Sequence, residues 1–425
     1  MTTVRLRHLA QVNPPTPAFD RLADEDELTF LPMEAVWPGS RLDIKLRRIK
    51  AVVATGYTRF QDGDVLVPKI TPTFEAGRAV LIGGLLGGVG AGTTELHVVR
   101  PGPRIDPRFL FYVVNTHSFL KLGAAEMYGV AGQQRVPDAF LRDLPVELPV
   151  LEEQRRIADF LDAEAAHIDN LVARRHRQSE LMRERFESLT KSVTGRTALR
   201  FGTLPDGWST QQLRRTLTSL KTGTTPSSDN TEIWMEMDGG TRTEAVPWYG
   251  PSNIEGLLEL SPSVKYLPQS AITERVVPRF PSGSVLVIGI GATAGKVAYL
   301  DHEGTGNQQI TALIPKPGMM GRFLAWQLWA ATDELRELAP YTTLPIINND
   351  FLKNFSIAVP PAAHQRVVID RLDQAASRLR ASGRATQQAL SLLAERRQAL
   401  ITAAVTGQLD VTTASGRNVT DGVSA

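Results

Sequence analysis

Hydrophobic residues recur at seven-residue spacing in two long stretches of the chain, and this spacing is typical of paired helices. In the first stretch the spaced positions are Ala158, Ala165, Val172, Ser179, Phe186 and Val193, and Leu161, Ile168, Arg175, Met182 and Leu189. In the second they are Ile369, Ala376, Gly383, Leu390, Arg397 and Ala404, and Leu372, Leu379, Thr386, Leu393 and Leu400. Both stretches are apolar toward their ends and interrupted by polar or small residues near the middle.

Antiparallel pairing of these helices would set polar middle against polar middle and apolar end against apolar end. Each helix follows a proline, Pro149 or Pro360, and precedes a glycine, Gly195 or Gly407, that is suited to a C-terminal cap. At 1.5 Å per residue each would be roughly 60 Å long. We therefore predict an antiparallel coiled coil whose helix-pairing residues are Leu161, Ile168, Met182, Leu189, Leu372, Leu379, Leu393 and Leu400.

The two helical stretches belong to a repeat that covers most of the chain. With an offset of 211, residues 140–189 align with residues 351–400, and thirteen of the fifty pairs are identical. After one inserted residue, Val-Thr-Gly at 193–195 aligns with Val-Thr-Gly at 405–407. Fainter echoes precede the helices, such as "FQDGDVLV" (60–67) and "FPSGSVLV" (280–287). Each half thus consists of a body followed by a long helix, and the helices of the two halves are more alike than the bodies. The first body is residues 1–148 and the second body is residues 198–358.

The two bodies have the sequence pattern of α/β units with short strands. "GDVLVPKI" and "GSVLVIGI" are compact β-branched runs after a glycine turn, whereas "DPRFLFYVVNTHSFL" and "GRFLAWQLWAATDELREL" carry helical spacing. The final segment, 412–425, is small and polar, which predicts a flexible tail.

Composition narrows the class of protein only moderately. The 425 residues include no Cys, which excludes disulfides and thiolate metal sites and suits a reducing compartment. No stretch approaches the roughly 18 apolar residues of a membrane span, so we expect a cytoplasmic protein without a membrane partner. The net charge is only +2, so nucleic-acid binding would depend on local clusters of Arg and Lys.

Motifs that would carry catalysis are incomplete. "GIGATAGKV" (289–297) follows a predicted strand, but Ile290 and Val297 stand where a phosphate loop needs Gly and Ser or Thr. "NPPT" (13–16) lacks the aromatic residue that would stack on a flipped base, and we interpret it as an irregular loop. The seven His residues show no metal-ligand spacing. We expect no catalytic residue and no metal site in this chain.

Polar side chains suited to DNA concentrate in predicted loops of both bodies. Arg and Lys can bond guanine O6 and N7, Asn and Gln can bond adenine, and Ser and Thr hydroxyls can hold phosphates. The candidates in the first body are Lys69, Thr71, Arg78, Gln133, Gln134 and Arg135. Those in the second body are Lys221, Thr224, Thr225, Thr293, Lys296, Asn307, Gln308, Gln309, Thr343 and Asn348. Their joint pattern predicts DNA binding more strongly than any single residue does.

The helix starts and ends resemble those of the specificity subunit of type I restriction-modification systems. The resemblance is carried by "LPVLEEQRRIADFLD" and "VPPAAHQRVVIDRLD" at the helix starts, by the Val-Thr-Gly endings, and by "GQQRVP", "GATAGKV" and "GNQQITALIP" in the bodies. It implies an α+β fold in which two α/β target recognition domains are joined by two long antiparallel coiled-coil helices in a pseudo-two-fold tandem repeat. The implied domains are target recognition domain 1 (1–148), a central conserved helix (149–197), target recognition domain 2 (198–358), a C-terminal conserved helix (359–411) and the tail (412–425).

The resemblance also implies a function. Each recognition domain would read one half of a bipartite, asymmetric double-stranded DNA target, and the helices would set the spacer and dock two methyltransferase subunits. Two motor-nuclease subunits would be an optional addition. This chain would bind no cofactor, and S-adenosylmethionine, ATP and Mg would be held by the partner subunits.

Three alternatives stay open at this point. The first is a specificity subunit of a methylation-only or other phage-defence complex. The second is a stand-alone DNA methyltransferase or nuclease, which the missing motifs disfavour. The third is a coiled-coil scaffold without a DNA role, for which two elaborate bodies would be superfluous.

Overall fold

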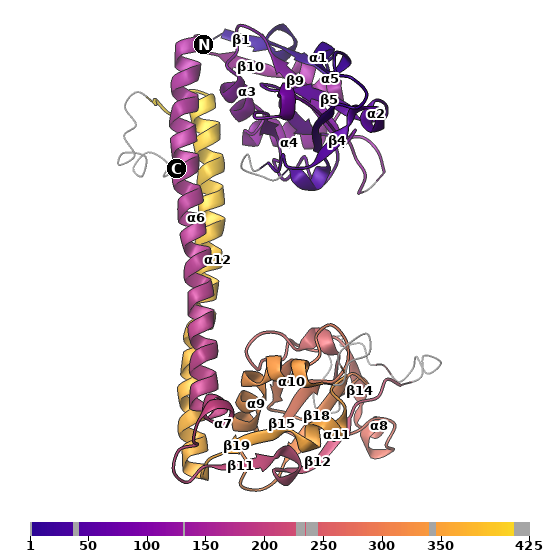
Figure 1. Ribbon diagram of the computed structural model, residues 1–425, viewed down its shortest axis with the longest axis vertical. Coiled ribbons are helices and arrows are strands. Elements are labelled where there is room, and N and C mark those ends of the chain that lie inside the picture. Colours follow the sequence, from indigo (N-terminus) through magenta and orange to yellow (C-terminus); the bar gives the residue numbers. More distant parts are fainter. Residues whose placement is uncertain are drawn as a thin grey trace. The chain divides into compact units, whose positions relative to one another are not determined.

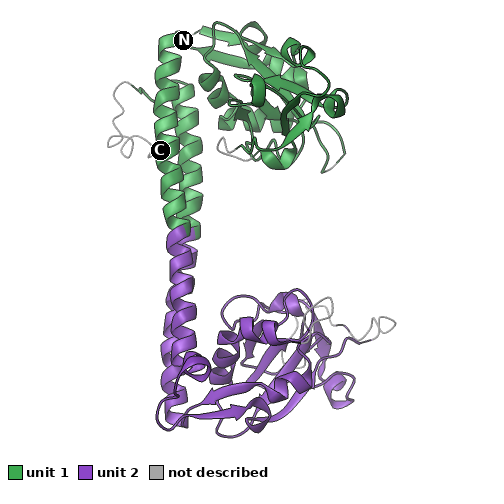
Figure 2. Ribbon diagram, in the orientation of Figure 1, with its two compact units in different colours: residues 1–176, 387–425 green, residues 177–386 purple. Residues whose placement is uncertain are grey.

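The computed structural model describes residues 2–36, 42–130, 132–226, 234, 245–339 and 346–411. The chain divides into two compact units, residues 1–176 with 387–425 and residues 177–386 (Figure 2). Each unit contains one body together with a part of each long helix. The predicted flexible tail, 412–425, lies outside the described residues.

The two long helices are α6 (Leu151–Val193, 43 residues) and α12 (Ala362–Val405, 44 residues) (Figure 1). Both end at the predicted glycines, because Gly195 has φ +75° and Gly407 has φ +70°. Only glycine adopts this left-handed conformation at little cost, and it terminates helices for that reason. Just before each glycine a threonine hydroxyl, that of Thr194 or Thr406, donates to the carbonyl four residues earlier at 2.6 or 2.7 Å.

Within each unit the long helices pack through their apolar stripes. In the first unit Leu161, Ile168 and Leu400 are buried in one core, and Leu393 packs against it. In the second unit Leu372 is buried, and Leu189 and Leu379 are partly buried against the same core. The eighth predicted pairing residue, Met182, accepts a hydrogen bond from Ser382 Oγ at 3.1 Å, in the softer middle of the stripe.

The first body contains two four-stranded sheets and one two-stranded sheet. Their orders are β2-β9-β6-β7, β4-β3-β8-β5 and β1-β10, and every pair is antiparallel except β3 with β8. The strands are β1 (Thr2–Arg5), β2 (Ala10–Val12), β3 (Glu27–Leu31), β4 (Arg47–Ile49), β5 (Thr58–Gln61), β6 (Val65–Pro68), β7 (Val80–Leu81), β8 (Val89–Gly92), β9 (Leu96–Pro101) and β10 (Pro145–Leu148). The helices are α1 (Pro17–Asp20), α2 (Lys50–Val53), α3 (Pro107–Val113), α4 (His117–Ala125) and α5 (Asp138–Asp143), with 3-10 turns at Leu6–His8, Met33–Ala35 and Leu86–Gly88.

The second body repeats this plan. Its sheets have the orders β12-β18-β15-β16, β14-β13-β17 and β11-β19, and again one pair, β13 with β17, is parallel. The strands are β11 (Ser209–Gln212), β12 (Leu217–Thr222), β13 (Ala245–Tyr249), β14 (Tyr266–Pro268), β15 (Ser284–Ile288), β16 (Val297–Leu300), β17 (Thr305–Gly306), β18 (Ile310–Pro315) and β19 (Ser356–Val359). The helices are α7 (Arg196–Phe201), α8 (Gln269–Thr273), α9 (Gly321–Ala330), α10 (Thr332–Leu338) and α11 (Asn349–Asn354), with 3-10 turns at Leu213–Arg215 and Pro251–Asn253.

A buried glutamine joins each long helix to its body. The amide of Gln154 accepts from Asp106 N at 2.8 Å and donates to the carbonyls of Arg104 and Pro149 at 3.1 and 2.9 Å. Gln154 is 0% exposed, so its amide bonds these three main-chain groups in a place that bulk water does not reach. One amide therefore satisfies a donor and two acceptors that would otherwise be buried without partners.

The second glutamine makes the same three bonds in the second unit. Gln365, 1% exposed, accepts from Met320 N at 2.8 Å and donates to Gly318 O and Pro360 O at 3.1 and 3.3 Å. The tandem repeat is thus reproduced at the level of single hydrogen bonds.

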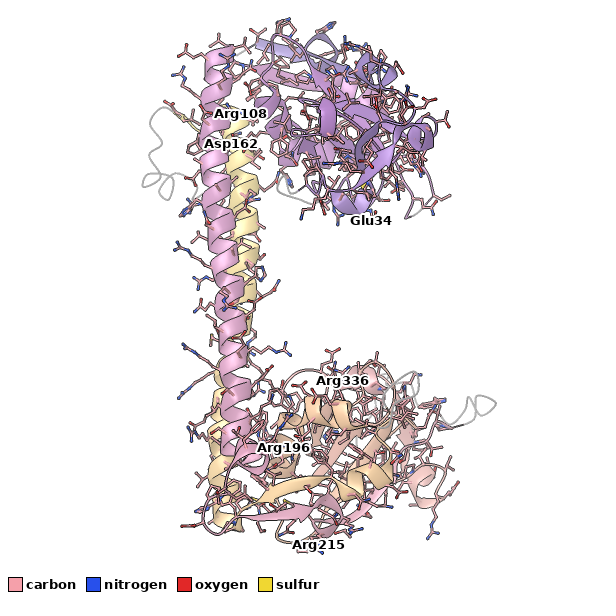
Figure 3. All side chains as sticks on the ribbon, in the orientation of Figure 1. Glu34, Arg108, Asp162, Arg196, Arg215 and Arg336 are labelled. Carbon is pink, nitrogen blue, oxygen red and sulfur yellow. The ribbon has the colours of Figure 1, made fainter. Side chains whose placement is uncertain are left out.

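A carboxylate two helical turns further on adds a second link in each unit. Asp162 accepts from Arg108 Nη1 at 2.9 Å and from the Tyr112 hydroxyl at 2.6 Å (Figure 3). In the second unit Asp373 accepts from Arg322 Nε at 2.6 Å and from Trp326 Nε1 at 2.9 Å. Each body is therefore held to its long helix through both polar atoms of one glutamine and both oxygens of one aspartate.

We expect Gln154→Ala to lower the free energy of unfolding by about 1–3 kcal/mol, because the substitution leaves buried main-chain groups unbonded. Denaturant unfolding of the purified chain measures this change. The matched control is Gln388→Ala, which removes an exposed amide from the other long helix. Equal stability of the two variants would contradict the role assigned to Gln154.

Candidate nucleic-acid interface

The structure brings four of the six first-body candidates together where two loops meet. Residues 69–71 follow β6, and residues 133–136 precede α5. Thr71 N donates to Gln134 O at 3.0 Å, Val136 N donates to Lys69 O at 2.9 Å, and Gln134 N donates to the Thr71 hydroxyl at 3.3 Å. Lys69, Thr71, Gln134 and Arg135 are therefore neighbours, and Gln133 precedes them as an exposed residue.

A glutamate that was not among the sequence candidates lies within this group. Arg135 donates to Glu95 through Nε at 2.9 Å and through Nη2 at 2.7 Å. The hydrogen bond from Arg135 holds the pKa of Glu95 below its usual range, so this carboxylate is charged. Lys69 donates through Nζ to Thr94 O at 2.8 Å, and burial lowers its pKa from the ordinary value. The cations Lys69 and Arg135 thus lie beside the carboxylate of Glu95.

Arg135 also closes a small hairpin. Its main chain exchanges both hydrogen bonds with Tyr128, at 2.9 and 3.2 Å. Two side chains at its start, those of Tyr128 and Val130, are 63% and 73% exposed. An exposed aromatic residue and an exposed aliphatic residue therefore flank the polar group. Neither was predicted from the sequence, because only polar side chains were considered as candidates.

Arg78 does not join this group. Its Nη1 donates to Val36 O at 3.4 Å, and its Nε is buried without a hydrogen-bond partner among the described residues.

In the second body, the candidates on residues 224–225 and 307–309 come together. Thr224 N donates to Gly306 O at 2.8 Å, and the Thr225 hydroxyl donates to Gln308 Oε1 at 2.6 Å. Asn307 and Gln309 bond each other through side chain and main chain at 3.2 and 3.0 Å. These residues form a second polar group.

The two polar groups stand on the same main-chain junction. Lys69 N donates to Glu95 O at 2.8 Å, and the matching bond in the second body joins Gly289 N to Gln309 O at 2.7 Å. The bond from Val136 N to Lys69 O is matched by one from Ile347 N to Gly289 O at 2.8 Å. The bridge between Ile70 and Arg135 is matched by one between Ile290 and Ile346. Hence Gln309 and Ile346 occupy the positions that Glu95 and Arg135 occupy in the first body.

The remaining second-body candidates lie elsewhere or have another role. Lys296 lines a 600 Å³ cavity with Arg183, Gly383 and Arg336, and Thr293 accepts from Lys296 N through its carbonyl at 3.2 Å. Lys221 lies within β12, opposite Ala312 of β18. Asn348 caps α11, since its side chain accepts from Phe351 N at 2.8 Å. Thr343 lies outside the described residues.

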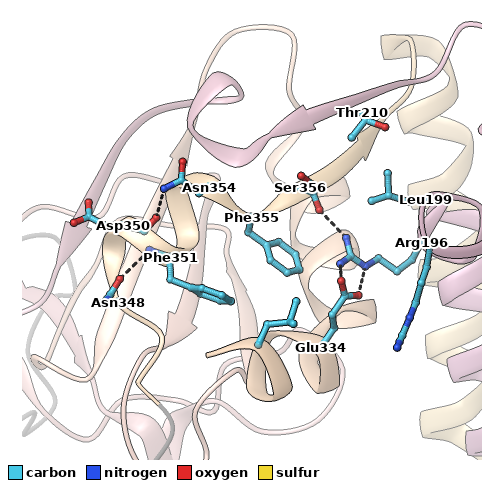
Figure 4. A pocket seen from close by; sticks show the side chains of 12 residues that line it. Arg196, Leu199, Thr210, Glu334, Asn348, Asp350, Phe351, Asn354, Phe355 and Ser356 are labelled. Atoms are coloured by element: carbon cyan, nitrogen blue, oxygen red, sulfur yellow. Dashed lines mark hydrogen bonds and ion pairs between the residues drawn. The ribbon is translucent and has the colours of Figure 1, made fainter. Parts of the chain in front are cut away.

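A second cavity, of 870 Å³, lies beside α7, α10 and α11 (Figure 4). Its charged lining is largely paired: buried Arg196 donates to Glu334 through Nε at 2.8 Å and to Ser356 O through Nη1 at 2.7 Å. Arg196 immediately follows the capping Gly195, so this pair fixes the chain as it leaves α6. We assign these contacts to the scaffold.

The described residues contain no group of three or more His, Cys, Asp or Glu side chains arranged to hold a metal ion. Over the same ranges, we find no helix whose length and apolar content would let it cross a bilayer.

A family model for the type I restriction modification DNA specificity domain matches residues 79–175 and 205–388. The chain belongs to this family. The matched ranges include the start of both long helices, the loop with Gln134 and Arg135, and the polar loops of the second body, so the family resemblance predicted from the sequence is confirmed.

Known members of the specificity family share part of this sequence. The specificity subunit of the type I restriction enzyme EcoAI from Escherichia coli is 40% identical over 156 residues, which cover 36% of this chain and 26% of that protein. The specificity subunit of EcoEI from Escherichia coli is 40% identical over 158 residues, with the same two coverages. The alignments thus span about a quarter of the length of these relatives.

Solved structures show the same fold over nearly the whole chain. The HsdS subunit from Thermoanaerobacter tengcongensis covers 96% of this chain and 97% of its own length at 19% identity, with a TM-score of 0.55. A second solved structure comes from work on complex assembly and conformational transition of the type I R-M system. One of its chains matches with a TM-score of 0.71 at 20% identity, and the match covers 96% of this chain and 98% of that chain. The predicted α+β fold with two long helices is confirmed.

Within the first body of this specificity-domain protein, a buried histidine anchors the loop that leads to Arg135. His97 Nε2 donates to Val136 O at 2.9 Å, so the neutral ring accepts from Asn13 Nδ2 at Nδ1, at 3.2 Å. Asn13 Oδ1 in turn accepts from Val98 N at 3.0 Å, which gives the "NPPT" segment a structural role. Burial lowers the pKa of His97 to about 4.

This low pKa predicts acid sensitivity. Between pH 6.5 and 4 the unfolded chain binds a proton at His97 that the folded chain does not, so stability falls as the pH is lowered through this window. The slope should reach up to about 1.4 kcal/mol per pH unit. Denaturant unfolding at several pH values measures it, and His97→Gln should flatten the slope. Gln388→Ala, a change at an exposed residue without a titratable group, is the control and should leave the slope unchanged.

Proposed function

We propose that this chain is the DNA-specificity subunit of a type I restriction-modification complex. Each body reads one half of a bipartite double-stranded DNA target, and the long helices set the spacer between the halves. The chain contributes recognition and no catalytic residue. Membership of the specificity family supports this proposal, as do the EcoAI and EcoEI specificity subunits, which share part of the sequence.

The observation that carries the proposal is one main-chain junction built twice with different side chains. The first body presents Lys69, Glu95 and Arg135 at positions where the second body has Gly289, Gln309 and Ile346. Equal scaffolds with unequal donors and acceptors are suited to reading two different base sequences. An asymmetric target follows from this arrangement.

The partners follow from the same proposal. Two methyltransferase subunits dock on the long helices and bodies and bring S-adenosylmethionine, and a restricting complex adds two motor-nuclease subunits with ATP and Mg. The complex works in the cytoplasm, where its DNA target is found.

Co-expression with a methyltransferase subunit of a type I restriction-modification system tests the proposal. We expect sequencing of the host DNA to reveal N6-methyladenine in one split motif, with two half-sites at a fixed gap. The purified chain alone should transfer no methyl group from S-adenosylmethionine to DNA. Methyl transfer without a partner, or methylation without a motif, would contradict the proposal.

Shortening both helices tests their role as the spacer. Deletion of residues 174–180 and 384–390 removes about 10 Å of helix, which corresponds to roughly three base pairs. We expect the complex to keep both half-site sequences while the gap becomes shorter. The matched variant with seven residues added to each helix should lengthen the gap. New half-site sequences at an unchanged gap would contradict the assignment.

A further inference from the structure

The ion pair between Glu95 and Arg135 leaves part of the guanidinium unoccupied. An arginine side chain has five N–H donors. Nε and Nη2 donate to the Glu95 carboxylate at 2.9 and 2.7 Å, and Nη1 donates to Gln133 O at 3.3 Å. Three donors are thus engaged, and one remains on each terminal nitrogen. The Arg135 side chain is 40% exposed, so these two donors can meet a ligand.

The main-chain junction does not require this ion pair. The second body makes the same three main-chain connections with Gln309 and Ile346 at the equivalent positions, and these two side chains cannot form an ion pair. A contact needed only to hold the two loops together would have a counterpart there. The pair therefore serves something that belongs to the first body alone.

The charge balance argues against a simple phosphate contact. A residue that attracts the DNA backbone gains from an uncompensated positive charge. Glu95 cancels the charge of Arg135, and the field of Asp138 also reaches the neighbouring Lys69. A carboxylate here weakens attraction to a polyanion but holds the planar guanidinium in one orientation. Orientation matters for base recognition, because base edges are distinguished by the direction of their donors and acceptors.

We propose that Arg135 is the residue of the first body that reads a guanine, with Glu95 as its positioning residue. The two remaining donors on adjacent nitrogens match the O6 and N7 acceptors of guanine in the major groove. The hairpin that carries Arg135 is exposed at Tyr128 and Val130, which leaves this edge of the body free to approach DNA. This assignment rests on the proposed function and adds the base class to it.

The test uses the complex with its methyltransferase partner and compares the wild type with Arg135→Lys and Glu95→Gln. Methylation is measured on a DNA library in which every base of both half-sites is varied. The wild type should require guanine at one position of one half-site. Arg135→Lys should reduce that preference roughly ten- to a hundredfold, since lysine cannot make the paired contact. The other half-site should stay unchanged.

Glu95→Gln separates positioning from scaffolding. It should relax the same guanine preference, while affinity for unrelated DNA stays equal or rises because a negative charge is lost. A purely structural role would lower methylation of all targets in proportion, without changing the preferred base. Arg5→Lys is the matched control, because Arg5 pairs with Asp143 at 3.1 Å in the same unit and should keep the wild-type motif.

The possible failures are distinguishable. A wild-type motif that both variants retain in full would overturn the assignment of Arg135 and Glu95 and leave the proposed function standing. A motif altered at a base other than guanine would also overturn it. Methylation by the wild type without any base preference would overturn the proposed function itself, and this inference with it.

Discussion

The hydrogen-bonding demand of buried main-chain groups at the start of each long helix is the constraint on which the rest of the structure depends. Gln154 and Gln365 each meet it with one side chain, by bonding a loop of the body and the proline carbonyl before the helix. An amide is the smallest side chain that offers both an acceptor and two donors from one rigid plane. Without this link the aspartate contacts and the apolar packing would still hold each body to its helix, but the three main-chain groups would be left without these partners.

The loops that carry the two polar groups are built on a different principle from the scaffold. At the helix starts the same residues perform the same bonds in both units, whereas at the loop junction the same main-chain bonds carry different side chains. The modest net charge of +2 fits this division, because the polar groups combine cations with Glu95 and with uncharged amides. Direction of donors and acceptors, more than accumulated positive charge, characterises these loops.

The features that could be predicted from sequence are those set by local periodicity and by the repeat. The seven-residue spacing and the capping glycines placed both long helices to within a few residues, and Thr71, Gln134 and Arg135 were identified as loop residues that the structure brings together.

Glu95 could not be found, because its partner lies forty residues away and nothing in the local sequence pairs them. Asn348 could have been recognised as a helix cap, since Asn before Asn-Asp-Phe is a typical helix start. Lys296 has the right chemistry for DNA, but its position beside the long helices depends on tertiary packing.

Each body begins and ends at one place. β1, the first strand of the first body, pairs with β10, the last, and β11 pairs with β19 in the same way in the second body. The entry and exit of each body are therefore adjacent, next to the start of a long helix, which is the geometry that tolerates insertion of one domain into another. A whole body could be exchanged by recombination with two crossovers, one at each of these paired strands. The glutamine at the helix start would keep its hydrogen bonds, because both bodies present the same kind of loop to it. The fold therefore allows a body to be replaced as one unit while the two long helices stay the same.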